Sequence, residues 1–166
     1  MKKLLFLALL IAPLSVFSQK FGHLDSGVVI QLLPEYTQAQ ADLQTLQKQF
    51  EDELQYMRDE FTRKSDEFST QSSTLPDNIR ERRDKELEEL YNKMNQYYQD
   101  SQQSLQLASQ EKMGEITTKV LKAIKQVGEE GGFVYIFDSA GDMVPYVSQT
   151  LSTDVTELVK AKLGIK

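Results

Sequence analysis

The sequence contains no cysteine, no tryptophan and a single histidine, His23. Without cysteine the chain has no disulfide, no thiolate-bound zinc or iron–sulfur cluster, no thiol nucleophile and no lipid-modified cysteine. One histidine also excludes a histidine-based metal cluster within a single chain. Apolar runs are short, because no stretch reaches the length of about 18 residues that a membrane-spanning helix needs. We therefore expect no metal and no cofactor.

The sequence also lacks the patterns of a catalytic site. There is no serine–histidine–aspartate set beyond the one histidine and no glycine-rich phosphate loop. His23 falls in a predicted strand, where a packing or surface role is expected, and Asp138 fits the chemistry of a tight turn. These absences predict a protein that is not an enzyme.

Positive charge is scarce, with 19 Lys and Arg against 25 Asp and Glu. Nucleic-acid binders normally carry a basic surface, so no nucleic acid is expected. The chain begins with Lys2 and Lys3, followed by an apolar run from Leu4 to Leu14. This pattern predicts a secretory signal peptide, residues 1–18, cleaved near Ser18/Gln19. Cleavage would remove both lysines and change the formal net charge from −6 to −8.

The middle of the chain, residues 35–127, is predicted to form two long helices. It is rich in residues that lose little freedom in a helix, and its apolar residues recur every three or four positions. Between the halves, serines, threonines and Pro76 predict a turn near 73–78, with Thr74 and Asp77 capping the second helix. A short turn folds the helices back antiparallel, so that residues whose numbers sum to roughly 150 lie at one height. Polar Ser101 interrupts the apolar seam.

The two ends of the chain are predicted to form a small β-rich head, residues 19–34 and 128–166. Strands are expected over Lys20–Leu24, over Phe133–Phe137 with both faces buried, and over Met143–Val147. A brief helix is expected over Gly27–Leu33, and a last helix begins at Asp154 and ends before Gly164. Three strands are too few to bury their faces, so subunits are expected to complete one shared core.

The order of these pieces resembles the Skp/OmpH family of periplasmic chaperones. Phe21–Asp25 followed by Val28–Pro34 is similar to the opening of the family. Phe133–Asp138 with Gly141, then Asp154–Val159 and Leu163–Lys166, is similar to its closing block. With the signal peptide and the helical centre, the resemblance covers essentially the whole chain.

The resemblance implies an α+β, mostly α fold, with a long antiparallel coiled-coil arm projecting from a β-rich trimerisation head. It also implies a homotrimer in the periplasm whose arms enclose unfolded outer-membrane proteins without nucleotide. The acidic charge departs from the family, whose known members tend to be basic. The expected residues of the trimer head core are Phe21, Leu24, Phe133, Tyr135, Ile136, Phe137 and Val144.

Four large apolar residues, Tyr56, Tyr91, Tyr98 and Leu107, fall off the predicted seam. One interpretation is packing between the helices just beside the seam. The other is a surface that contacts unfolded clients, because tyrosine offers contact area at low entropy cost and a hydrogen-bonding tip.

A basic cluster is expected near the arm tip. Acidic residues alternate with it, so a solvated helix face is the default, and transient contact with a membrane surface or an acidic client is the alternative. The cluster comprises Arg63, Lys64, Arg80, Arg82, Arg83 and Lys85.

Two functions remain open from the sequence. The first is an ATP-independent holdase that makes many weak contacts with unfolded outer-membrane β-barrel proteins. The second is a coiled-coil scaffold or spacer of the cell envelope with a fixed partner. Polar, glutamine-rich faces such as Gln96–Gln110 favour promiscuous contact and hence the first.

Overall fold

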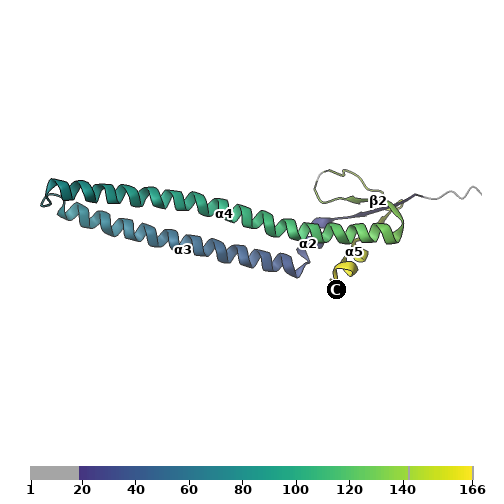
Figure 1. Cartoon of the computed structure of the whole chain (residues 1–166). Coiled ribbons are helices and arrows are strands. Elements are labelled where there is room, and N and C mark those ends of the chain that lie inside the picture. Colours follow the sequence, from purple (N-terminus) through teal and green to yellow (C-terminus); the bar gives the residue numbers. More distant parts are fainter. Residues whose placement is uncertain (1–18, 142, 166) are drawn as a thin grey trace, which may run out of the picture. The chain divides into compact units, whose positions relative to one another are not determined.

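The computed structural model describes residues 19–141 and 143–165, so the predicted signal peptide lies outside the described residues. The fold is α+β and mostly α, as predicted (Figure 1). Two compact units divide the chain. Among the described residues, the sheet unit contains those up to Gly27 and those from Lys122 onward, and the hairpin unit is Val28–Leu121. The predicted head and arm boundaries remain a proposal.

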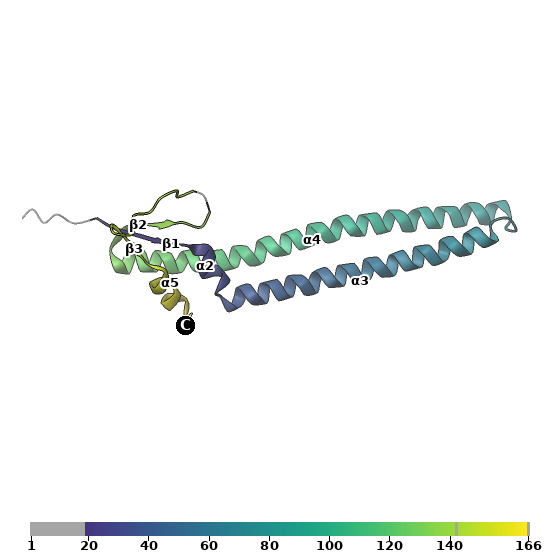
Figure 2. The same cartoon turned by 180° about the vertical axis from the view of Figure 1, so that it is seen from behind.

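Two long helices dominate the hairpin unit. Helix α3 spans Pro34–Gln71 and helix α4 spans Asp77–Gly131, whose last residues belong to the sheet unit. Figures 1 and 2 show α3 and α4 side by side and running in opposite directions. Ion pairs join Asp42 to Lys112, at 2.6 Å, and Glu35 to Lys119. These partners confirm the predicted antiparallel register.

The seam between the helices follows the predicted heptad pattern. Met57, Ile116 and Val120 are buried in it, and the rings of Phe50 and Tyr97 meet edge to face with centroids 6.2 Å apart. Ser101 is also buried, with 5% of its surface exposed. A polar residue therefore occupies a seam position, as the sequence indicated.

The turn between the helices differs from its predicted capping. The Thr74 hydroxyl donates to the carbonyl of Gln71, at 2.8 Å, so it stabilises the end of α3. Helix α4 begins at Asp77, and the N–H groups of Ile79 and Arg80 donate to the Pro76 carbonyl. The prediction that Thr74 caps α4 was wrong because its hydroxyl bonds backward along the chain.

Three parallel strands form the sheet, in the order β2–β1–β3. Strand β1 is Lys20–Leu24, as predicted, β2 is Phe133–Asp138 and β3 is Ser152–Asp154. At Gly22 an added Cβ would lie 3.1 Å from the side chains of Phe133 and Val155. An alanine there would force these side chains to shift by a few tenths of an ångström, because both pack against the backbone of the central strand.

Two predictions about the sheet were wrong. Met143 and Val144–Val147 form no strand among the described residues of that segment, and β3 takes the third place instead. Pro145 lacks the N–H that a ladder needs, which disfavours a strand there. Strand β2 is not buried on both faces of this chain, since Tyr135 is 61% exposed and Phe137 is 42% exposed.

Two short helices complete the elements, α2 over Ser26–Gln31 and α5 over Thr156–Leu163. The Asp154 carboxylate accepts a hydrogen bond from the Thr156 N–H, at 2.9 Å, and Gly164 ends α5 with a φ of 73°. The end of the helix at Gly164 was predicted, but the helix begins at Thr156, two residues after the predicted start at Asp154. Leu24, Val155 and Val159 are almost fully buried and form the core of the sheet unit.

Candidate functional site

An aromatic cluster covers one face of the sheet. The strand register aligns Phe21 of β1 with Tyr135 of β2, and Phe137 follows two residues later on the same face. The Phe21 centroid lies 6.4 Å from that of Tyr135 and 6.5 Å from that of Phe137. Tyr135 and Phe137, both predicted core residues, are thus exposed in one chain but share a continuous apolar face.

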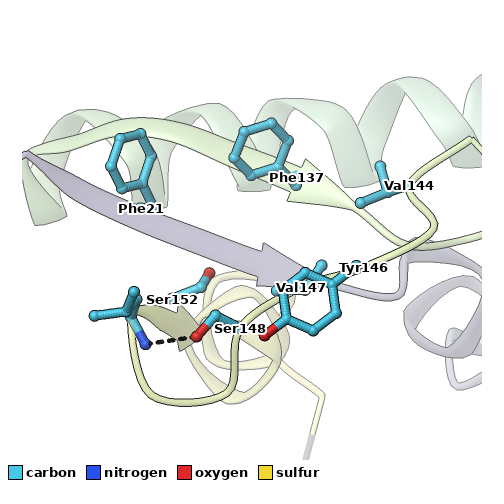
Figure 3. Close-up of a pocket in the computed structure, with 8 residues that line it drawn as sticks. Phe21, Phe137, Val144, Tyr146, Val147, Ser148 and Ser152 are labelled. Carbon is cyan, nitrogen blue, oxygen red and sulfur yellow. Dashed lines mark hydrogen bonds between the residues drawn. The ribbon is translucent and has the colours of Figure 1, made fainter.

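Beside this cluster lies a hollow of about 220 Å³. Phe21, Phe137 and Val144 border it, and Tyr146 stands on the loop that follows β2 (Figure 3). The loop closes through a hydrogen bond from the Ser152 N–H to the Ser148 carbonyl, at 3.1 Å. Leu151, also in the lining, is 81% exposed, so the hollow extends the apolar face.

The loop residues of this hollow were not predicted from the sequence. Tyr146 lies in Met143–Val147, for which the sequence predicts a strand returning from a tight turn, and the sequence predicts no role for Leu151. The residue types of this segment could have indicated an exposed apolar loop. Pro145 argued against a strand, and large apolar residues in a loop indicate a surface that something covers.

The remaining predicted core residues of the head lie on the opposite side or at the strand start. Leu24 is buried, with 1% of its surface exposed. The Ile136 side chain packs close to Gly128, because a Cβ added at Gly128 would lie 3.4 Å from the Ile136 Cδ1. Phe133 packs beneath the Lys20 ammonium, which lies 4.1 Å from the ring centroid. These residues pack within the sheet unit of a single chain.

His23 has a structural environment. It is 9% exposed, and its Nδ1 lies 2.9 Å from the Ser152 Oγ, joining β1 to β3. Asp154 is its register partner on β3. Hydrogen bonds from Thr156 hold the pKa of Asp154 below its ordinary value against the effect of burial, and the nearby His23 adds to the lowering. The three residues fasten a short strand to the sheet.

Asp138 organises the turn after β2. Its carboxylate accepts hydrogen bonds from the Ser26 N–H and from the Ala140 N–H, each at 3.0 Å, and from the Ser26 hydroxyl at 2.5 Å. Burial raises the pKa of Asp138, but these hydrogen bonds outweigh burial and hold it below its ordinary value. The contacts agree with the predicted turn role.

In the hairpin unit, the four predicted contact residues are exposed. The exposed fractions are 64% for Tyr56, 50% for Tyr91, 51% for Tyr98 and 56% for Leu107. Tyr91 also packs on the seam, since its ring centroid lies 6.1 Å from that of Phe61. Large apolar side chains are thus scattered over helix faces that are otherwise polar.

Comparison with known proteins identifies the family. The family model described as outer membrane protein (OmpH-like) matches residues 20–163. The chain belongs to this OmpH-like family. Its fold also matches a solved structure of an OmpH-like outer membrane chaperone from Caulobacter crescentus, with a TM-score of 0.74 and 18% sequence identity. The match covers 87% of this chain and 83% of that one. No curated protein matches the chain.

The basic residues of this OmpH-like chain near the hairpin turn are largely paired. Arg63 binds Glu67 at 2.7 Å and Lys64 binds Glu60 at 3.0 Å. Arg80 pairs with Asp77, and Arg82 and Arg83 both approach Glu86. Each pair joins residues three or four positions apart on one exposed helix. Such pairs contribute little stability but offset positive charge; Lys85 is the remaining member of the cluster.

Across the described residues of this OmpH-like chain, no group of three or more histidine, aspartate or glutamate side chains could bind a metal ion. Nor does any described helix combine the length and the apolar character that crossing a membrane requires.

Proposed function

We propose that this protein is an ATP-independent periplasmic holdase that keeps unfolded outer-membrane β-barrel proteins from aggregating. The observation that carries the proposal is the family match over residues 20–163, which spans both units of the fold. The similarity in fold to a protein named as an outer membrane chaperone supports it. The acting species is a homotrimer whose arms enclose the client.

The exposed face of the sheet supports assembly. Tyr135, Phe137, Tyr146 and Leu151 leave a contiguous apolar surface uncovered in the single chain. Contiguous apolar patches are uncommon on soluble monomers and mark interaction sites. A second and third copy of the chain would cover this face and complete the core that three strands cannot build alone.

The faces of the hairpin support loose contact with clients. Tyr56, Tyr91, Tyr98 and Leu107 stand apart among polar residues, so each offers a small apolar contact. Many weak contacts within one enclosure hold an unfolded chain without trapping it, because the contacts act together through their high local concentration. A fixed helical partner would instead need one continuous apolar stripe.

The proposed location is the periplasm, reached after cleavage of residues 1–18. At the hairpin turn, the paired arginines make capture of clients or lipid by net positive charge a minor contribution. Transient contact of the turn with a membrane surface is therefore proposed only as a secondary, salt-sensitive interaction.

The test is suppression of aggregation. An outer-membrane β-barrel protein is diluted from denaturant, and light scattering is recorded with and without the mature chain, in the absence of nucleotide. We expect scattering to fall in proportion to added trimer. Replacing Tyr56, Tyr91 and Tyr98 together with Ser should weaken protection while sedimentation still shows a trimer. Undiminished aggregation with a folded trimer present would contradict the holdase and favour the scaffold.

A further inference from the structure

The seam of the hairpin contains a hollow of about 420 Å³ next to Ser101. Its apolar lining is formed by Phe50 and Leu54 of α3 and by Leu105 of α4, with Tyr98 at the edge. The hollow is of the size that small-molecule sites have, about 300–1,000 Å³. It is far larger than the engineered cavity of about 150 Å³ that accepts a benzene molecule.

The hollow lies beside a buried seam position that a small residue occupies. Ser101 is 5% exposed, whereas Met57, Ile116 and Val120 occupy other seam positions with large side chains. Its hydroxyl donates to the main-chain carbonyls of Tyr97, at 2.6 Å, and Tyr98, at 3.0 Å. The hydroxyl proton is therefore used within the helix, and the floor offers space and weak polarity but no donor to a ligand.

The rim of the hollow is polar and carries balanced charge. Gln47, Gln55 and Gln102 place primary amides around the opening, which is also lined by one basic residue, Arg58, and one acidic residue, Glu51. The Nε2 of Gln47 donates to Glu51, at 2.7 Å, and that of Gln55 donates to Asp59, at 2.8 Å. Each of these amides retains a carbonyl oxygen that can accept a hydrogen bond from a peptide N–H.

We propose that this hollow binds a phenylalanine or tyrosine side chain of an unfolded client segment. This inference rests on the proposed function and assigns one contact between the holdase and its client to a defined site. The client ring would enter beside Phe50 and Tyr98, whose rings offer edge-to-face contact. The rim amides would pair with the client main chain, whose N–H and C=O groups have no partners within a segment that lacks secondary structure. The balanced rim charge explains why neither acidic nor basic segments would be required.

The mature full-length chain can be tested with two labelled, unstructured peptides that differ only in one position, Phe in one and Ser in the other. Binding is measured by fluorescence anisotropy. Ser101→Leu fills the hollow from its floor, and Ser104→Leu adds the same side chain at an exposed position on the same helix. We expect Ser101→Leu to weaken binding of the Phe peptide at least tenfold and to leave the Ser peptide unchanged. Ser104→Leu should lower neither affinity.

A second measurement does not depend on the variants folding. The Phe peptide is made with a benzophenone at the Phe position and photocrosslinked to the unmodified chain. Crosslinks within 47–58 and 98–105 would support the proposal. Crosslinks confined to other segments, or full affinity of a folded Ser101→Leu for the Phe peptide, would overturn it. If the wild type still suppresses client aggregation in that case, only the hollow is wrong; if it does not, the holdase function is wrong as well.

Discussion

The Ser26 hydroxyl donates to the Asp138 carboxylate at 2.5 Å, which links the start of α2 to the end of β2. The Ser26 N–H donates to the other carboxylate oxygen, at 3.0 Å. One ionised side chain thus closes the sheet unit between segments at opposite ends of the sequence. The contact carries a consequence for the acid stability of the protein.

Asp138 is expected to contribute stability that acid removes. Its pKa in the folded chain is below the ordinary value, so the unfolded chain binds the proton more readily. The contribution is therefore present above the unfolded pKa and is lost as pH falls through the folded pKa. Asp138→Asn should lower the free energy of unfolding at pH 7 and flatten its decline on acidification. Urea unfolding at several pH values between about 3 and 7 measures this effect.

Asp66→Asn on the exposed face of α3 serves as the control, because it removes the same charge outside the sheet unit. It should leave the pH dependence close to that of the wild type. An Asp138→Asn variant whose stability falls with acid as steeply as wild type would show that the two hydrogen bonds to Ser26 contribute little.

Two glycines should respond oppositely to alanine. At Gly22 an added Cβ would approach the side chains of Phe133 and Val155 at 3.1 Å, so both side chains would have to shift. Gly22→Ala should destabilise the protein by about 1–3 kcal/mol. Gly114 lies within α4, exposed and with no atom within 4 Å of an added Cβ, so Gly114→Ala should stabilise by about 0.5–1 kcal/mol. Thermal melting of both variants decides the point.

The seam register can be tested at two adjacent residues. Met57 is 5% exposed and Tyr56 is 64% exposed. Met57→Ala should cost about 2–5 kcal/mol of unfolding free energy, because it leaves a cavity in the seam. Tyr56→Ala should change stability by less than about 0.5 kcal/mol. Equal losses at the two positions would mean that the helices pack on a different face.

Phe137→Asp should separate assembly from folding. The side chain is 42% exposed in the single chain but lies in the aromatic face that we propose is covered by other copies. A charge in a covered interface is costly when unpaired, so the variant should sediment as a smaller species. Leu158→Asp on α5, an exposed apolar residue that is not part of the aromatic cluster, is the control. Sedimentation velocity of both at micromolar concentration gives the answer, and an intact trimer in Phe137→Asp would contradict the proposed interface.

The long helices could be predicted because their determinants are local. Residues 35–127 contain few helix breakers, and a seam repeating every three or four residues fixes the face and the antiparallel pairing. Ser101 was placed in the seam by spacing alone. The position of Gly164 after the last helix is also local, since a left-handed residue commonly ends a helix.

The sheet could not be predicted to the same degree because its determinants are not local. Ser152–Asp154 has no apolar alternation, and it becomes a strand because the backbone of Phe21–His23 pairs with it. Val144 and Tyr146 have high strand propensity but acquire no partner strand among the described residues. The hollow beside Ser101 depends on the sizes of side chains from two helices, which spacing does not give.

The central strand of the sheet, β1, is the first of the three strands to be synthesised, and both of its neighbours come from the C-terminal part of the chain. Lys20 pairs with Phe133 and Phe21 pairs with Ser152. A chain that emerges from its N-terminus can form the local pairing of α3 with α4 early, but β1 must wait until nearly the whole chain has been released. These pairings have high contact order and should form last. The sheet can therefore form only when the C-terminal segments are present, and a chain truncated before β2 would leave β1, with Phe21, unpaired.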